Sequence, residues 1–277
     1  MTEFLRKKAA LMSAAFCLFG AASCVNLDHI GGSRQSVEDW GKKQHFGAMT
    51  LHAGAFDLLV LEKRTGNNNA LVVYIEGDGS AWNTRYHPPR DPTPENPVAL
   101  TLAAADPSPA VVYLGRPCQY LDKQALANCS PVWWTTQRFS NEVLAAYEQA
   151  LNMLKVQSGA KTLRLVGYSG GGVIAALLAM RRGDVTSLIS VASPLALGEW
   201  TRLQGISALS DSLDPLLETG SLPPATTYWI GTRDEIVPVS VVATFAQNKG
   251  GTVRPVKGYD HDCCWTNAWK QLLKESP

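Results

Sequence analysis

Seven apolar segments alternate with helical patterns along most of the chain, and this alternation limits the fold more than any other feature. The segments are rich in β-branched and aromatic residues and read FDLLVLEK, ALVVYIEG, AVVYLG, TLRLVG, SLISVAS, TTYWIGT and TVRPVKG. The clearest helical pattern spans 141–157, where apolar residues recur on one face: Val143, Leu144, Tyr147, Leu151 and Leu154. Strands that alternate with helices form a mostly parallel sheet with helices on both faces. We therefore expect one α/β domain.

Composition and charge exclude some other classes of protein. The chain has 277 residues, 45% of them hydrophobic and 18% charged, which suits a globular domain with a large core. Its formal charge is +1, and basic residues are not clustered beyond the first eight positions. The sequence therefore lacks the electrostatic pattern of a nucleic-acid-binding protein.

The N-terminus has the pattern of a signal for export. Three basic residues precede an apolar stretch of 14 residues, Ala9 to Ala22, which is shorter than the roughly 20 residues that span a bilayer. The stretch ends in AASC and resembles the lipobox of bacterial lipoproteins, although Ala21 stands where leucine is usual. That resemblance implies cleavage after residue 23, lipidation of Cys24 and, since Val25 is not aspartate, anchoring in the outer membrane facing the periplasm. Ordinary cleavage at an A-x-A-like site is the alternative.

We therefore divide the chain into a signal peptide at 1–23, a polar tether at 24–45 and a folded domain at 46–277. The stretch 195–224 interrupts the strand–helix alternation and is expected to be a small, mainly helical insertion. Whether it acts as a lid is left open. The sequence does not indicate an oligomeric state.

One serine lies among glycines where the apolar segment 163–166 meets the next helical pattern. The motif Gly167-x-Ser169-x-Gly171 in this context is typical of a nucleophile elbow, in which a sharp turn exposes the serine hydroxyl. The N-terminus of the helix would then present the Gly170 N–H to a developing oxyanion. A phosphate-binding loop would instead need G-x-x-x-x-G-K-[ST] or G-x-G-x-x-G, and neither is present.

A nucleophile elbow requires an acid and then a histidine later in the chain. His261 is the sole histidine after Ser169, and it follows the last apolar segment. Asp234 follows TTYWIG and would accept the imidazole N–H, with Glu235 and Glu199 as alternative acids. Separately, Asp234 could be a turn residue and His261 a surface residue. Their order and their positions after strands together predict a Ser-Asp-His triad.

A second oxyanion donor is expected in the loop after ALVVYIEG. Asp78 and Gly79 lie in Gly77-Asp78-Gly79, where the main chain can turn its N–H groups toward the serine. An ordinary D-G turn at the end of a strand is the alternative interpretation.

These motifs give the chain a resemblance to the α/β-hydrolase superfamily, from about Phe56 to Trp269. The matching residues lie in GYSGG, GTRDEIVP and GYDH. The resemblance implies an α/β-hydrolase fold with an eight-stranded, mostly parallel sheet, a small helical insertion after the sixth strand, and acyl transfer through a serine ester. It also implies no metal and no organic cofactor. Glu76-Gly77 departs from the His-Gly of many esterases and lipases, which weakens assignment to a lipase subgroup.

The expected activity is hydrolysis of a small or lipid-like acyl substrate through an acyl-enzyme, with a carboxylic ester preferred over a thioester or amide. An acyltransferase or peptidase on the same triad is one alternative. A non-catalytic envelope lipoprotein that uses the fold for binding is another. Tryptophans in predicted loops could line an acyl pocket or simply pack loops onto the core: Trp82, Trp133, Trp134 and Trp265.

Four cysteines besides Cys24 remain after the expected cleavage, and export makes disulfides plausible. Cys118 and Cys129 are eleven residues apart in a loop-like stretch and are predicted to pair. Cys263 and Cys264 could be buried thiols or an adjacent-residue disulfide, and a bond from Cys118 to either of them would replace the predicted pair. No C-x-x-C or H-E-x-x-H motif favours a metal site.

Overall fold

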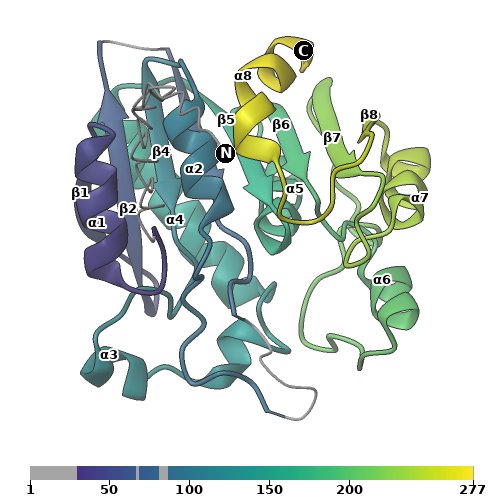
Figure 1. The fold of residues 1–277 in the computed structure, drawn as a ribbon, viewed down its shortest axis with the longest axis horizontal. Coiled ribbons are helices and arrows are strands. Elements are labelled where there is room, and N and C mark those ends of the chain that lie inside the picture. The colour runs from purple at the N-terminus through teal and green to yellow at the C-terminus, as the bar shows by residue number, and fades with distance from the viewer. Residues whose placement is uncertain (1–29, 67–68, 81–86, 277) are drawn as a thin grey trace, which may run out of the picture.

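An eight-stranded sheet forms the centre of the protein (Figure 1). The computed structural model describes residues 30–66, 69–80 and 87–276. The strand order is β1-β2-β4-β3-β5-β6-β7-β8; β1–β2 and β2–β4 are antiparallel, and the other pairs are parallel. The strands are β1 Gly47–Ala53, β2 Phe56–Arg64, β3 Ala70–Ile75, β4 Ala110–Leu114, β5 Thr162–Tyr168, β6 Val185–Val191, β7 Ala225–Gly231 and β8 Thr252–Val256.

Helices cover both faces of this sheet, as the strand–helix alternation predicts. One face packs against α4 Asn141–Ser158, α5 Gly170–Arg181, α6 Leu197–Gln204 and α7 Val239–Lys249. The other packs against α1 Arg34–Lys43, α2 Val98–Ala105 and α8 Trp265–Glu275. Two short helices, α3 Lys123–Ala127 and η1 Pro131–Trp134, lie between β4 and α4. Successive residues of β3 point to opposite faces and are buried on both, which explains its unbroken apolar sequence.

The predicted helix at 141–157 is confirmed as α4. It begins where the Ser140 hydroxyl accepts a hydrogen bond from the Val143 N–H, and it ends at Gly159, whose φ of 70° is left-handed. The helix returns the chain to the start of β5, so Ser169 follows at the carboxyl edge of the sheet.

The described part of the expected tether, residues 30–45, is not an extended linker. It contains α1, which begins at an N-cap, Ser33, and buries Val37 and Gly41 against the sheet. The folded domain therefore begins before residue 46. α1 was missed because its sequence, RQSVEDWGKK, is polar on most of its faces.

The insertion at 195–224 follows β6, as expected, but it is less helical than predicted. Only α6 is helical, and the residues from 205 to 224 form turns and irregular chain. No helix in the described ranges is long and apolar enough to cross a membrane.

At the far edge of the sheet, β8 is a five-residue strand that contains Pro255 and pairs only with β7.

Candidate active site

Ser169 lies on a sharp turn between β5 and α5. Its φ of 50° and ψ of −124° are unusual for a residue with a side chain. Its main-chain N–H donates to the Val191 carbonyl at 2.8 Å, which fixes the turn to the neighbouring strand β6. The turn therefore lifts the serine hydroxyl out of the sheet edge.

The glycines of the motif are required by close backbone approach. A Cβ at position 167 would lie 2.3 Å from the Gly171 carbonyl oxygen, and one at position 171 would lie 2.1 Å from the Ile75 carbonyl oxygen. Only glycine lets β5, α5 and β3 meet this tightly. The structure thus gives the geometric reason for the G-x-S-x-G spacing.

His261 and Asp234 complete a hydrogen-bonded chain with Ser169. The Ser169 hydroxyl lies 3.1 Å from His261 Nε2, and His261 Nδ1 lies 2.9 Å from Asp234 Oδ2. The other Asp234 oxygen, Oδ1, accepts from the main-chain N–H groups of Ile236 and Val237 at 3.0 and 2.7 Å. The Asp234 side chain is fully buried. A carboxylate held in this way orients the imidazole with Nδ1 protonated and Nε2 free to accept from the serine.

The three side chains come from the ends of three parallel strands. Ser169 follows β5, Asp234 follows β7 and His261 follows β8, so the carboxyl edge brings together residues far apart in the chain. Glu235, one of the alternative acids, is exposed, and the Asp234–His261 contact leaves it no part in this chain of hydrogen bonds.

A cavity of about 860 Å³ opens beside Ser169 and His261. Its walls come from the oxyanion loop at 76–80, the loop at 94–96, the chain after η1, the acid turn and the start of the 195–224 insertion. Apolar lining residues from the last two elements are Trp200, Ile206, Leu209 and Ile236. The insertion therefore forms one wall of the cavity.

Neither a protein-family model nor a curated protein matches this sequence. Solved structures do match. Est1E from Butyrivibrio proteoclasticus is 13% identical, with a TM-score of 0.57, over 83% of this chain and 98% of that one. XC6422 from Xanthomonas campestris, described as an α/β serine hydrolase without lid, is 16% identical, with a TM-score of 0.55, over 84% and 96%. A membrane phospholipase A described as a bacterial virulence factor is 16% identical, with a TM-score of 0.51, over 87% and 90%.

The chain has the α/β-hydrolase fold. The overall structural similarity to these neighbours extends over 83–87% of this chain. The predicted fold class is confirmed, including the eight strands and the insertion after β6.

The oxyanion loop of this α/β-hydrolase fold follows β3. The Gly77 N–H is already used, because it donates to Glu76 Oε1 at 2.8 Å. Asp78 and Gly79 both line the cavity, and Gly79 has a left-handed φ of 65°. Among the described residues, the main-chain N–H groups of Asp78 and Gly79 have no acceptor. Gly170 is the first residue of α5, where a helix leaves its N–H groups unpaired. This geometry is compatible with the three predicted donors.

Glu76 is a buried acid that the sequence marks only as a departure from His-Gly. Its side chain is 1% exposed, and Oε1 accepts from the Gly77 and Ala99 N–H groups at 2.8 and 3.4 Å. Burial raises its pKa from 4.5 to about 7, against the opposing effect of those hydrogen bonds. Glu76 therefore ties the oxyanion loop to the start of α2.

The Asp78 side chain is held by two buried arginines that sequence reasoning missed. Arg116 Nη1 lies 2.9 Å from Asp78 Oδ1, and Arg138 Nη1 lies 2.6 Å from Oδ2. The Asp78 carboxylate packs directly against Gly170, where a Cβ would lie 2.0 Å from Oδ1. These contacts fix the oxyanion loop against the nucleophile elbow.

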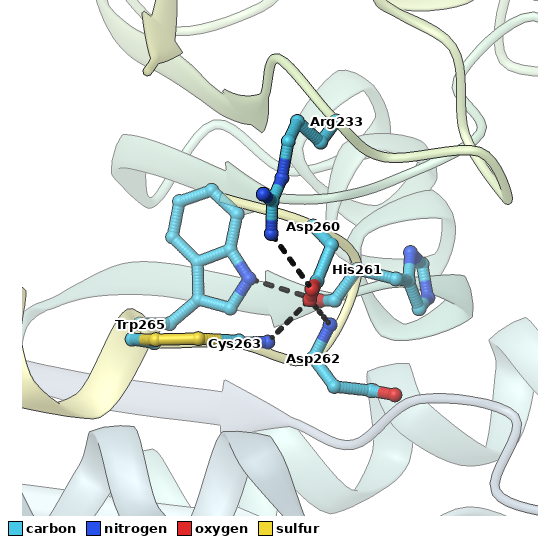
Figure 2. Close-up of a disulfide and its surroundings, with 7 residues drawn as sticks. Arg233, Asp260, His261, Asp262, Cys263 and Trp265 are labelled. Carbon is cyan, nitrogen blue, oxygen red and sulfur yellow. Dashed lines mark hydrogen bonds and ion pairs between the residues drawn. A yellow bond between two sulfur atoms is a disulfide. The ribbon is translucent and has the colours of Figure 1, made fainter. Parts of the chain in front are cut away.

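Hydrogen bonds made by residues before and after His261 fix the loop that carries it (Figure 2). The Asp260 carboxylate accepts from the N–H groups of Asp262 and Cys263, and Trp265 Nε1 donates to the His261 carbonyl at 2.9 Å. Tyr168, which precedes Ser169, donates through its hydroxyl to the Asp262 carboxylate at 2.7 Å. Burial raises the pKa of Tyr168 well above its ordinary value, so this hydroxyl keeps its proton.

The described part of the chain contains two disulfides. Cys263 and Cys264 form an adjacent-residue bridge just after His261 (Figure 2), which resolves the open question about this pair. Cys118 and Cys129 also pair, as predicted. This second bridge does not line the cavity. The loop that this bridge closes supports the loop after β3 instead, because Gln119 Nε2 donates to the Gly77 carbonyl at 3.1 Å.

Of the two alternatives for the loop tryptophans, the described residues favour packing onto the core over lining the cavity. Trp133 packs edge-on against Phe56, and Trp134 and Trp265 are buried away from the cavity. Trp82 lies outside the described residues, as does Cys24. In the parts of the chain that the structure describes, no group of three or more His, Cys, Asp or Glu side chains could hold a metal ion.

Proposed function

We propose that this protein is a serine hydrolase that cleaves a carboxylic ester, or a thioester or amide, through an acyl-enzyme. The observation that carries the proposal is the hydrogen-bonded series Ser169, His261, Asp234 at the mouth of the cavity. Two structural neighbours are described as an α/β serine hydrolase and a membrane phospholipase A, which supports the same chemistry.

The first half of the reaction forms the acyl-enzyme. Ser169 Oγ attacks the acyl carbonyl carbon while His261 Nε2 takes the hydroxyl proton, and Asp234 stabilises the imidazolium. The N–H groups of Gly170 and of Asp78 or Gly79 bind the oxyanion. The tetrahedral intermediate then expels the alcohol, thiol or amine, which leaves with the proton from Nε2.

The second half releases the acid. Water donates a proton to His261 Nε2 and attacks the serine ester, and the collapse of the second intermediate returns that proton to Ser169 Oγ. Every group in these two steps belongs to this chain, to the substrate or to water.

A fluorophosphonate probe tests the proposal. The probe should label purified wild-type protein on Ser169, identified by peptide mass spectrometry, and heat-unfolded protein should not react. Ser169→Ala should abolish labelling, whereas Ser240→Ala, which changes an exposed serine on α7, should not. Equal labelling of Ser169→Ala and wild type would contradict the assignment.

We also propose that the protein is exported and lipid-anchored through Cys24 in the outer membrane, facing the periplasm. The lipobox-like AASC and the following Val25 support this location. Wild-type protein should partition into detergent with the membranes, and Cys24→Ala should be soluble or uncleaved. Recovery of all wild-type protein in the soluble periplasmic fraction would refute the anchor.

A further inference from the structure

The first described residues of the chain are fixed to one loop of the domain. The Gly32 N–H donates to the Pro94 carbonyl at 2.8 Å. Gly31 lies so close to Glu95 that a Cβ there would be 2.2 Å from the Glu95 carbonyl oxygen. Ile30 packs its partly buried side chain against the same core face as α1. The point at which the N-terminal segment joins the fold is therefore well defined.

That loop is also part of the cavity. Pro94, Glu95 and Asn96 line it together with Ser169 and His261. Whatever precedes Ile30 thus approaches the domain at the rim of the site. Cys24 is six residues before Ile30, and six residues span at most about 20 Å even when fully extended. An anchor on Cys24 would hold this rim, and no other edge of the sheet, close to the membrane surface.

Exposed apolar side chains from other elements also border the cavity. Ile206 and Ile236 both line it, yet they are 44% and 47% exposed. Leu203, also 44% exposed, lies one turn earlier, at the end of α6. Gln204 Nε2 joins the two segments by donating to the Ile236 carbonyl at 2.9 Å. We call Leu203, Ile206 and Ile236 the apolar rim.

We propose that the lipid anchor and the apolar rim hold the cavity mouth against the bilayer, and that the substrate is the acyl ester of a phospholipid in that same membrane. This inference rests on the proposed hydrolase function and on lipidation of Cys24. Both sides of the cavity mouth then help the substrate to enter from the bilayer. The 94–96 loop lies near the anchor, and the apolar rim receives an acyl chain as it leaves the bilayer. Apolar residues in such a position lower the cost of moving that chain into the site.

The test compares two substrates with the full lipidated protein. The protein is reconstituted into vesicles of phosphatidylethanolamine and phosphatidylglycerol, and fatty acid release is measured by mass spectrometry. Hydrolysis of p-nitrophenyl butyrate, a soluble ester, gives the reference rate. The measured quantity is the ratio of the lipid rate to the soluble-ester rate.

The first variant carries a proline-rich spacer of twenty residues between Leu27 and Asp28. It adds roughly 60 Å of stiff chain between the anchor and the domain, and it leaves the fold from residue 30 onward unchanged. We expect the ratio to fall at least five-fold while the soluble-ester rate stays the same. An unchanged ratio would overturn the inference.

The second variant tests the apolar rim with a matched control. Leu203→Asp should also lower the ratio several-fold. Val156→Asp should not, because Val156 is 80% exposed near the end of α4, at the opposite edge of the sheet. Equal effects of the two substitutions would overturn the role of the rim.

The two proposals fail in different ways. Wild-type protein that hydrolyses the soluble ester but releases no fatty acid from its own vesicles refutes this inference and leaves the hydrolase function standing. Wild-type protein that hydrolyses neither substrate refutes the hydrolase function, and the inference is refuted with it.

Discussion

Glu76→Gln should remove a pH dependence from the stability of the protein. Burial raises the pKa of Glu76 from 4.5 to about 7 in the folded state. Between these two values the folded protein holds a proton that the unfolded chain has lost. The free energy of unfolding therefore falls as the pH rises through this window and is highest below pH 4.5. A shift of this size corresponds to about 3 kcal/mol.

The glutamine side chain is the right probe, because it resembles the protonated acid and cannot ionise. Its amide oxygen can still accept from the Gly77 and Ala99 N–H groups that Glu76 Oε1 contacts. We expect wild type to lose roughly 2 to 3 kcal/mol of stability relative to Glu76→Gln between pH 5 and pH 8. Glu235→Gln, at an exposed carboxyl, is the control and should follow the wild-type curve.

Urea denaturation at several pH values between 5 and 8 measures this difference. Other titrating groups cancel, since wild type and variant share them. Parallel curves for wild type and Glu76→Gln over the whole range would show that Glu76 is not protonated at neutral pH. In that case the reasoning from burial would be refuted.

Two further predictions concern the acid and the local disulfide. Asp234→Asn should lower kcat on p-nitrophenyl butyrate by about three to four orders of magnitude with little change in fold, because the asparagine amide no longer orients the imidazole; steady-state kinetics and circular dichroism check this, and wild-type turnover would exclude Asp234 as the acid. Replacing Cys118 and Cys129 together by serine should lower the free energy of unfolding by about 3 kcal/mol through the freed loop, which urea denaturation measures, and an unchanged midpoint would contradict the loop-entropy argument.

The sequence predicts the triad geometry because each member carries a local signal. Ser169 has its glycines, Asp234 and His261 follow apolar strands, and their chain order is fixed by the fold. Parallel strands bring their carboxyl ends to one edge, so three separate local predictions become one site. The same reasoning explains the success with α4 and with seven of the eight strands, β2 to β8.

The support around the site has no comparable signal. Arg116 and Arg138 are 22 residues apart and meet at Asp78 only through tertiary packing. Glu76 directly follows the apolar strand β3, but its burial depends on α2 packing over it. β1 was missed for a related reason, since most of its seven residues are exposed and it is held mainly by pairing with β2. A residue or strand whose position depends on partners distant in the sequence shows no periodic sequence pattern from which it could be predicted.

Strand β8 has a consequence for how copies of the protein behave when crowded. It is one of the two edge strands of the sheet, and Pro255 has no N–H to donate there. A second molecule that paired with β8 would meet a strand of five residues in which one backbone N–H donor is missing. Molecules confined to a surface collide edge to edge far more often than in solution. The proline therefore disfavours continuation of the sheet from one molecule to the next through β8.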